Sequence, residues 1–520
     1  MGKIDESKLL QQSRRGLLSI LFSRTTLVVL LLLANFVLLF SFLLGLLDGL
    51  PLLTGSMTVF TAAMMLYVLN TADNPTLKLS WCAIIGVLPV FGAALYCYIR
   101  SDLGHRIAKR LVNSSIEASL PHVPEQEKLL TQLREEEPEF AGIAQYLHEH
   151  AHASVCAEAD TRYFPSGESM FAQMLQELEK AEEFIFLEYF IVEQGQMWGS
   201  ILDVLHRKAQ AGVEVRLLYD GTCAITTLPS GYPRQMEQLG IRCRMFAPVR
   251  PLVSTHYNYR DHRKIMVIDG RTAFTGGVNL ADEYINVREK YGHWKDTGLM
   301  VRGEAARSFT LLFLQMWNYP DREREFAPYL KEARRDSAPG YVIPFGCGPS
   351  TPERVGEMVY LNMLSQARDH VYIMTPYLIL DGEMVTALRF AARRGVDVRL
   401  VLPHIPDKKY AFALAKSHYR ELLEAGVKIY EYTPGFVHGK VFLCDGRHGV
   451  VGTINLDFRS LYLHYECGAY LYKVPALADM RRDFEDTLEK SRRITMEDVK
   501  MQSLLSRATA AILKVFAPLM

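Results

Sequence analysis

A chain of 520 residues is longer than one hydrophobic core usually supports, so two or more domains are expected. Its 58 basic and 58 acidic residues give a net charge of zero, which argues against a protein built mainly to hold nucleic acid. The eight cysteines are scattered and include no CxxC pair, which argues against a disulfide framework and favours a reducing compartment.

The N-terminal part of the chain combines a basic segment, residues 1–24, with three uncharged apolar runs. The run from Thr25 to Leu47 contains no charged residue, and it is long enough to cross a bilayer. This run is too long for the core of a signal peptide, and no small-x-small cleavage site follows it, so a retained anchor is expected. We therefore predict an all-α transmembrane block at 25–99, with helices at 27–47, 51–70 and 79–99. For the second run, which is rich in Thr and Gly, a buried helical hairpin is the alternative.

The charges beside this block do not agree with three crossings. Basic residues precede the block, and Arg100, Arg106, Lys109 and Arg110 follow it. Three crossings would place the two groups on opposite sides, against the positive-inside tendency. Either one run is re-entrant or interfacial, or the charge rule fails here. We expect a multi-pass protein of the cell membrane whose C-terminal domains face the cytoplasm.

Residues 100–155 are charged and favour helices, and we expect a linker there. His148, His150 and His152 stand at two-residue spacing, which can suggest a metal site. Because residues two apart do not share a face of a helix, a solvated linker or a helix end is the favoured interpretation.

From about residue 160, helix-like and strand-like segments alternate. The strand patterns FIFLEYFIV and GVEVRLLYDG are followed in the second half by HVYIMTPYLI and GVDVRLVLPH, in the same order. Helices between near-continuous apolar strands imply mixed sheets that are covered by helices. The internal match predicts two copies of one α/β domain, at 156–335 and 336–520.

Each predicted domain contains the pattern HxKxxxxD, followed after six residues by GGxN or GTxN. The residues of the two copies are His262, Lys264, Asp269, Gly277 and Asn279, and His438, Lys440, Asp445, Thr453 and Asn455. A strand has a period of two, so the His and Lys of each copy point to one face. Burying an imidazole beside an ammonium is costly without an anionic partner, which makes phosphate the natural occupant. A single HxK pair is common on strands, but the full spacing found twice favours a catalytic site.

The aspartate of each pattern is expected to have a different task. Asp269 lies seven residues from His262 and therefore faces the opposite side of the strand. In both copies the aspartate is followed by glycine, a strong hairpin signal. We expect Asp269 and Asp445 to set the turn and hold the site together without touching the substrate.

The paired patterns resemble the HKD motifs of the phospholipase D superfamily, and the chain most resembles the bacterial cardiolipin synthases within it. The resemblance includes the membrane segments, where Pro89, Gly92 and Tyr96 match a pattern of that family. It implies two phospholipase D-like α-β-α sandwich domains, packed about a pseudo-twofold axis so that two His and two Lys surround one phosphate. One departure is Gly277, where many members have Ser; Thr453 supplies a hydroxyl in the second copy.

Two carboxylates follow the motifs at parallel places. Asp296 lies 34 residues beyond His262, and Glu466 lies 28 residues beyond His438. A carboxylate that accepts one imidazole N–H fixes the tautomer and leaves the other nitrogen free to react. The resemblance implies this orienting role, and the alternative is an ordinary surface strand end. The final stretch, SLLSRATAAILKVFAPLM, is expected either to lie on a membrane surface or to pack on the second domain.

Phosphodiester transfer at such a site needs charge neutralisation and a nucleophile. The two lysines, with Asn279 and Asn455, are expected to hold the non-bridging oxygens. One histidine attacks phosphorus to give a phosphohistidine, while the other protonates the departing alcohol and later activates the acceptor. We assign His262 as nucleophile and His438 as acid and base; the reverse assignment stays open. No metal or other cofactor is expected.

The resemblance implies the substrates, which are two phosphatidylglycerol molecules that give cardiolipin and glycerol at the bilayer. Membrane anchoring independently favours a lipid. A hydrolytic phospholipase D or a nuclease of the same superfamily is the second hypothesis, and zero net charge counts against the nuclease. An inactive membrane scaffold with a phosphate pocket is the third, and the intact His and Lys of both copies count against it. Whether phosphatidylethanolamine also serves, and the oligomeric state, are left open by the sequence.

Overall fold

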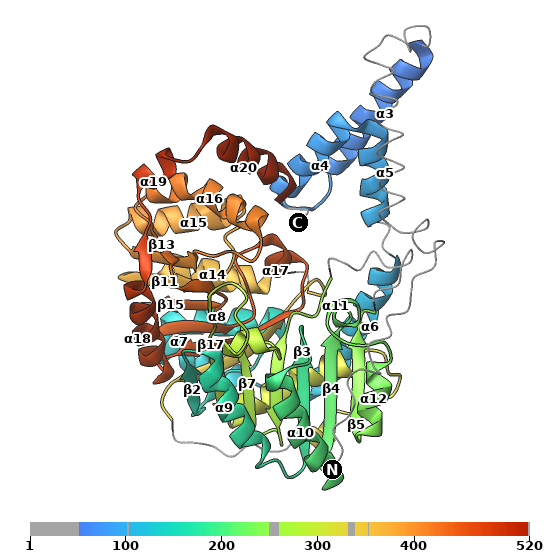
Figure 1. Cartoon of the computed structure of the whole chain (residues 1–520), viewed down its shortest axis with the longest axis vertical. Helices are drawn as coiled ribbons and strands as arrows, with labels where there is room; N and C mark the ends of the chain where they lie inside the picture. The colour runs from blue at the N-terminus through green and yellow to red at the C-terminus, as the bar shows by residue number, and fades with distance from the viewer. Residues whose placement is uncertain (1–50, 101–102, 249–258, 331–337, 352, 518–520) are drawn as a thin grey trace. The chain divides into compact units, whose positions relative to one another are not determined.

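The computed structural model describes residues 51–100, 103–248, 259–330, 338–351 and 353–517 (Figure 1). The chain divides into two compact units, and each is described by itself. One unit comprises residues 1–107, 249–257 and 511–520, and the other comprises residues 108–248 and 258–510. The predicted helix at 27–47 lies outside the described residues.

The described part of the first unit is a small helical cluster. It contains α3 (Pro51–Leu69), α4 (Pro75–Val87) and α5 (Pro89–Arg100). Its core joins all three helices through Val68, Trp81, Ile84, Ile85 and Tyr96. The Tyr96 ring meets the Trp81 ring edge to face, with 5.2 Å between their centroids.

The helix predicted at 79–99 is wrong as one continuous element, whereas α3 agrees with the run predicted at 51–70. The third run breaks at Leu88, because Pro89 has no N–H to continue α4 and instead begins α5. A Cβ on Gly92 would lie 2.9 Å from Cα of Ile85, so the close approach of the two helices requires glycine there. Among the described residues, no helix combines the length and the apolar character needed to cross a membrane.

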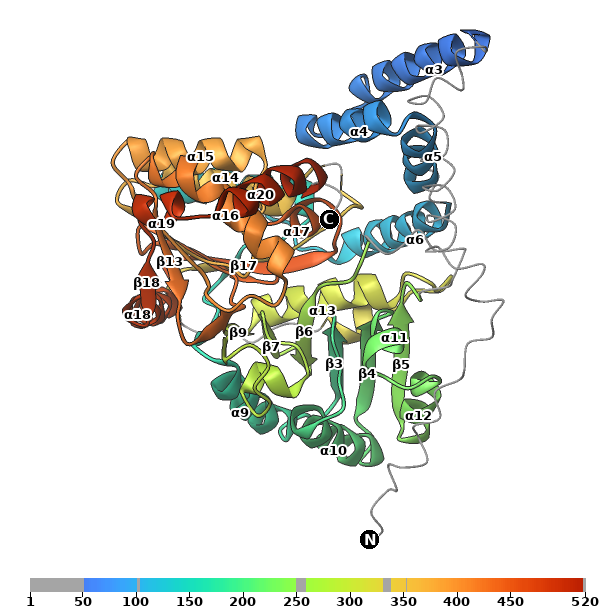
Figure 2. The same cartoon turned by 45° about the horizontal axis from the view of Figure 1, so that its top comes forward.

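The second unit contains two mixed β-sheets. The first sheet has the strand order β2-β9-β7-β6-β3-β4-β5. Its strands are β2 (Thr161–Phe164), β3 (Phe184–Tyr189), β4 (Glu214–Asp220), β5 (Ile241–Phe246), β6 (Lys264–Ile268), β7 (Thr272–Gly276) and β9 (Gly298–Arg302). The helices of this half are α9 (Gly167–Leu178), α10 (Gln196–Gln210), α11 (Cys223–Thr226), α12 (Tyr232–Gln238) and α13 (Glu304–Trp317). Figure 2 shows α9 and α10 on one face of the sheet and α13 on the other.

The second sheet has the order β1-β10-β17-β16-β15-β11-β12-β13-β18. Its strands are β1 (Cys156–Ala157), β10 (Tyr341–Cys347), β11 (His370–Met374), β12 (Asp397–Pro403), β13 (Lys428–Tyr432), β15 (Val441–Cys444), β16 (His448–Gly452), β17 (Glu466–Tyr472) and β18 (Ser491–Arg493). The helices are α14 (Val355–Gln366), α15 (Gly382–Arg393), α16 (Lys409–Leu423), α17 (Phe458–Tyr462), α18 (Ala476–Glu489), α19 (Met496–Lys500) and α20 (Leu504–Phe516). Helices α14, α15 and α16 pack on one face of this sheet and α18 on the other.

The two sheets repeat one topology. The seven strands β10-β17-β16-β15-β11-β12-β13 follow the same order as the seven strands of the first sheet, strand for strand. The predicted repeat of mixed, helix-covered sheets is therefore confirmed. The boundary predicted after residue 335 falls in 331–337, outside the described residues, and stays a prediction. Strand β1 at Cys156–Ala157 pairs with β10 and so belongs to the second sheet, although it precedes the first.

The stretch predicted as a linker is mostly helical in its described residues, and its last helix packs into the core, which corrects the prediction for that part. These residues form α6 (Leu103–Ser119), the short η2 (Leu120–His122), α7 (Glu127–Glu136) and α8 (Pro138–Ala151). Phe140 and Leu147 of α8 are fully buried against the second sheet, and the Phe140 ring stacks on Tyr472 with 4.4 Å between centroids. The helix end expected near the three histidines is confirmed, because His152 caps α8 in the left-handed conformation.

The two halves share a core and a short interdomain sheet. Strands β7 and β9 of the first sheet contact β16 and β17 of the second, and α13 and α18 contribute to the same apolar cluster. In addition, β8 (His293–Lys295) of the first half pairs in parallel with β14 (Gly435–Val437) of the second. The remaining short helices are η3 (Asp282–Ile285) and η4 (Ala327–Tyr329).

Asp269 and Asp445 each accept backbone N–H groups at a hairpin, as expected, whereas the expected lack of contact with substrate stays a prediction. The carboxylate of Asp269 accepts the backbone N–H groups of Glu182, Glu183 and Phe184 at 2.8–2.9 Å. Asp445 accepts three N–H groups at the equivalent place, from Arg368, Asp369 and His370. Both aspartates adopt positive φ in tight hairpins.

Asp269→Asn is expected to destabilise the first α/β domain by about 2 kcal/mol, because the amide nitrogen cannot accept a backbone N–H and leaves a donor unsatisfied. Asparagine tolerates positive φ, so the change isolates the hydrogen bonds. Urea denaturation measures the effect. Asp160→Asn, which removes a half-exposed ion pair with Arg302, serves as the control with a small expected change. Equal urea midpoints for Asp269→Asn and the parent would contradict this role.

Candidate active site

The backbone of each motif histidine is held by the opposite half. His262 lies two residues before β6, and its N–H donates to the carbonyl of Tyr465 at 2.9 Å. His438 lies between β14 and β15, and its N–H donates to the carbonyl of Lys295 at 2.7 Å. The histidines were predicted on strands, and they stand just before the strands that carry the rest of each motif. Their position therefore depends on how the halves dock.

The side chains of these histidines also cross between the halves. Nδ1 of His262 donates to Glu466 at 2.9–3.0 Å, and Nδ1 of His438 donates to Asp296 at 2.7 Å. Both carboxylates are fully buried. This hydrogen bonding selects the Nδ1–H tautomer and leaves Nε2 of each ring as the reactive nitrogen. The sequence predicted two orienting carboxylates, and the structure brings each to the histidine of the other half.

Burial keeps both imidazoles neutral in the free protein. It lowers the pKa of His262 to about 3 and that of His438 to about 4, although the carboxylates act in the opposite direction. The ammonium of Lys440 lies 2.9 Å from Nδ1 of His438 and adds to that lowering. In return, the imidazoles help hold the pKa of Glu466 and Asp296 below the usual range, against the effect of burial.

The two lysines are buried, and among the described residues neither ammonium lies within ion-pair distance of a carboxylate. The ammonium of Lys264 donates to the carbonyl of His262 at 2.6 Å, and that of Lys440 donates to the carbonyl of His438. Both side chains are about 1% exposed. Burial lowers the pKa of Lys264 to about 8 and that of Lys440 to about 7, and the charge of Lys264 contributes to the shift at Lys440. An anion bound between them would raise the pKa of both lysines and keep both side chains protonated.

The two motif asparagines are placed differently. Asn279 accepts the N–H of Ile191 at 3.0 Å and donates to the hydroxyl of Tyr284 at 2.8 Å, so the protein itself fixes its amide. Asn455 is buried, and its side-chain oxygen has no hydrogen-bond partner within the described ranges. The expected contact of either amide with phosphate stays a prediction.

Thr453 is placed beside Glu466, and its predicted contact with phosphate stays a prediction. Its hydroxyl is completely buried and donates to Glu466 at 2.5 Å. At the equivalent place in the first half, a Cβ on Gly277 would lie 1.9 Å from Oδ1 of Asp296, so the carboxylate occupies the space that a side chain would need. Gly277 therefore makes room for Asp296, and Thr453 anchors Glu466.

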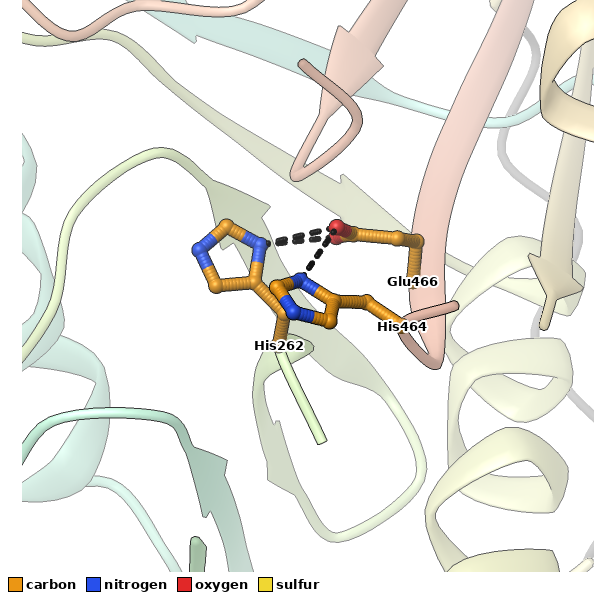
Figure 3. A group of neighbouring side chains, drawn as sticks. All are labelled: His262, His464 and Glu466. Atoms are coloured by element: carbon orange, nitrogen blue, oxygen red, sulfur yellow. Dashed lines mark hydrogen bonds and ion pairs between the residues drawn. The ribbon is translucent and has the colours of Figure 1, made fainter. Parts of the chain in front are cut away.

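Several further residues surround the histidines and were not singled out from the sequence. The hydroxyl of Ser460 donates to the second oxygen of Glu466 at 2.5 Å. The Trp294 ring N–H donates to Asp296 at 3.3 Å, and the indole lies 5.3 Å from the His438 ring. His464 faces Glu466 from beside His262 (Figure 3). Trp294 and His464 each stand two residues before a carboxylate, and the period of a strand could have revealed them.

Two α/β domains that each give a histidine and a lysine to one buried site have the arrangement of the phospholipase D class. The family described as "Cardiolipin synthase, PLD-like domain" matches residues 174–317 and 360–488. The chain belongs to this family.

Known relatives extend the match over most of the chain. A cardiolipin synthase of Alkalihalophilus pseudofirmus is 35% identical over 460 residues, which cover 86% of this chain and 90% of that protein. A cardiolipin synthase of Geobacillus kaustophilus is 34% identical, and the matched residues cover 92% of this chain and 95% of that protein. An uncharacterised protein of Streptococcus mutans is 49% identical over 88% of this chain and 99% of its own.

A solved structure supports the fold alone. The crystal structure of phosphatidylserine synthase from Haemophilus influenzae Rd KW20 matches 73% of this chain and 97% of its own, with a TM-score of 0.56 and 17% identity. The likeness in strand arrangement therefore extends well beyond the likeness in sequence.

Proposed function

We propose that this protein is a phosphatidyltransferase that joins two phosphatidylglycerol molecules to give cardiolipin and glycerol. The observation that carries the proposal is the crossed pair of buried histidines, each oriented by a carboxylate of the other half and accompanied by a buried lysine. Two neutral imidazoles and two buried lysines, which have no ion-pair partner among the described residues, suit a phosphodiester anion. Membership of the cardiolipin synthase family supports this lipid substrate class.

The first half of the proposed reaction forms a covalent intermediate. A bound phosphodiester brings negative charge, which raises the pKa of the histidines and lysines, so His438 enters the step protonated. Nε2 of His262 attacks phosphorus, the bond to the glycerol headgroup breaks, and Nε2–H of His438 donates its proton to the departing oxygen. The product of this step is a phosphatidyl-histidine and free glycerol, with Lys264 and Lys440 balancing the charge on the non-bridging oxygens.

The second step of the proposed reaction returns the site to its starting state. The terminal hydroxyl of another phosphatidylglycerol loses its proton to His438 and attacks phosphorus, and the bond to His262 breaks. While cardiolipin is still bound, His438 holds the proton that the acceptor lost; when the anionic product leaves, the pKa of His438 falls, the proton passes to solvent, and the next phosphodiester brings a proton with it. When a lipid alcohol takes the place of water, the same two steps give transfer instead of hydrolysis.

We also propose that the protein works at the cell membrane, with the run at 27–47 as an anchor and the two α/β domains on the cytoplasmic side. Helices α3 and α4 expose large apolar side chains, among them Val59, Leu66, Leu79 and Val87 at 61–70%. Helix α20 exposes Leu504, Leu505 and Ile512 and carries Arg507 and Lys514, which suits an anionic lipid surface. The number of crossings and the pseudo-twofold axis relating the halves remain parts of this proposal.

A product assay tests the proposed function. Purified full-length protein is given phosphatidylglycerol in liposomes with EDTA present, and the products are separated by chromatography. The proposal predicts cardiolipin and free glycerol in equal amounts. Phosphatidic acid as the main product would indicate hydrolysis, and an absence of turnover in the parent would indicate a non-catalytic protein; either result would overturn the proposal.

The pH dependence should reflect the lowered pKa of Lys440. Because this pKa is about 7 in the free protein, the ammonium is lost as pH rises through that value, whereas an ordinary lysine stays charged to about 10. The kcat/KM for phosphatidylglycerol, which reports the free enzyme, should fall roughly tenfold per pH unit above about 7, and kcat should fall less. In Lys440→Arg, which cannot deprotonate, this alkaline fall should diminish. A parent kcat/KM that stays level to pH 9 would refute this account of the lysine.

A further inference from the structure

A group of three metal-ligating side chains lies beside the reacting histidine. Nδ1 of His262 contacts Glu466 at 2.9 Å, and Nδ1 of His464 lies 3.6 Å from the same carboxylate. One ligand atom from each of the three residues can be chosen so that all lie within 4.8 Å of one another. Figure 3 shows both imidazoles turned toward the Glu466 carboxylate. Both ring nitrogens of His464 are buried, and neither has a hydrogen-bond partner of normal geometry among the residues that the structure describes.

The donor set fits a borderline transition metal. Two imidazoles and one carboxylate form a common three-ligand zinc set that leaves a fourth position open. Zn–N and Zn–O bonds of about 2.0–2.2 Å place tetrahedral ligand atoms about 3.3 Å apart. The two contacts with Glu466, at 2.9 and 3.6 Å, bracket this spacing, whereas the two imidazoles, whose ligand atoms lie within 4.8 Å, would have to approach each other to close the set around an ion. Mg²⁺ prefers an oxygen-rich octahedral site and does not suit it.

A metal ion at this position would stop the reaction, because it would change the tautomer of His262. In the free site, Nδ1 carries the hydrogen that it donates to Glu466, and Nε2 holds the reactive lone pair. A metal bound at Nδ1 takes the lone pair of that nitrogen, and the hydrogen of the neutral ring then resides on Nε2. An Nε2 that carries hydrogen can neither attack phosphorus nor accept a proton.

Within the described part of the chain, the site exists on one side of the active centre only. His464 stands two residues before Glu466, and the residue two before Asp296 in the other half is Trp294. The indole has no lone pair to offer a metal, and its N–H already donates to Asp296. Among the residues that the structure describes, the His262 cluster is the one group of this kind.

We propose that His262, His464 and Glu466 form an inhibitory site for Zn²⁺ and similar divalent transition metals. His464 is the residue that converts the orienting pair into a metal site. The inhibition part of the inference rests on the proposed function, whereas the binding part does not.

Binding is measured first, on full-length protein without a histidine tag, by competition between the protein and a chromophoric zinc chelator. The parent should show one tight site per chain that is lost in His464→Asn. Co²⁺ gives a second readout on the parent itself, since a site of low coordination number should produce strong visible absorption. His464→Trp, which copies Trp294, should lose the same site. His150→Asn, which removes an exposed histidine elsewhere, should keep it.

Activity is measured next with phosphatidylglycerol liposomes. Zn²⁺ at micromolar concentration should inhibit the parent, Mg²⁺ should not, and the half-inhibiting Zn²⁺ concentration should rise at least tenfold in His464→Asn. Equal binding and equal inhibition in parent and His464→Asn would overturn the inference, as would a parent that binds no metal. A parent that binds one Zn²⁺ through His464 but makes no cardiolipin without metal would retain the site and reject the proposed function.

Discussion

His262→Ala is expected to lower the rate of cardiolipin formation by at least about 10⁴-fold, and His438→Ala is expected to lower it by about 10²–10⁴-fold. Without His262 as nucleophile the covalent intermediate cannot form. Solvent can in part replace His438 as acid and base. His262→Ala leaves Glu466 buried without that imidazole, and His438→Ala does the same to Asp296, so thermal unfolding is measured in parallel.

The two variants should also differ in covalent labelling. With phosphatidylglycerol labelled at phosphorus, His438→Ala should accumulate an acid-labile phosphatidyl-histidine, because release needs a base that is absent. His262→Ala should remain unlabelled. Label on His262→Ala but not on His438→Ala would show that the assignment of nucleophile and acid is reversed.

Glu466→Gln is expected to reduce turnover by roughly 10³-fold, because His262 loses the acceptor that fixes its tautomer. The glutamine amide cannot accept the imidazole N–H and both hydroxyl donors that now converge on this carboxylate, from Thr453 and Ser460. Asp296→Asn should act on His438 in the same way. Each substitution lies in one half and disables the histidine of the other.

A matched control distinguishes this effect from the loss of any buried carboxylate. Glu431 is buried in the second half and contacts His404 at 3.0 Å outside the site. Glu431→Gln should therefore change stability more than kcat. If Glu466→Gln and Glu431→Gln lowered kcat to the same extent, the crossed pairs would have no special role in the reaction.

Local patterns predicted those parts of the site that depend on neighbours in the chain. The two-residue period placed each lysine beside its histidine, and the Asp-Gly dipeptides marked hairpins that the structure contains at Asp269 and Asp445. The repeated order of apolar strands predicted two related sheets, although it did not give the number of strands in each.

The parts that depend on docking could not be predicted in this way. His262 and Glu466 are 204 residues apart, and nothing in either motif says that they meet. The role of Thr453 follows from the same contact, because its hydroxyl is directed by a carboxylate that the motif does not contain. Helix α8 was taken as linker because its charged residues masked the Phe140 and Leu147 spacing that packs it on the second sheet.

Isotope exchange tests most directly the claim that one site carries a phosphatidyl group between two alcohols. Full-length protein is incubated with unlabelled phosphatidylglycerol and radioactive free glycerol, and label is followed at early times, before cardiolipin accumulates. A covalent intermediate reacts with glycerol as well as with a lipid alcohol, so label should enter phosphatidylglycerol at a rate at least comparable to cardiolipin formation, and both should vanish in His262→Ala. Cardiolipin formation without early incorporation of glycerol would contradict the two-step transfer.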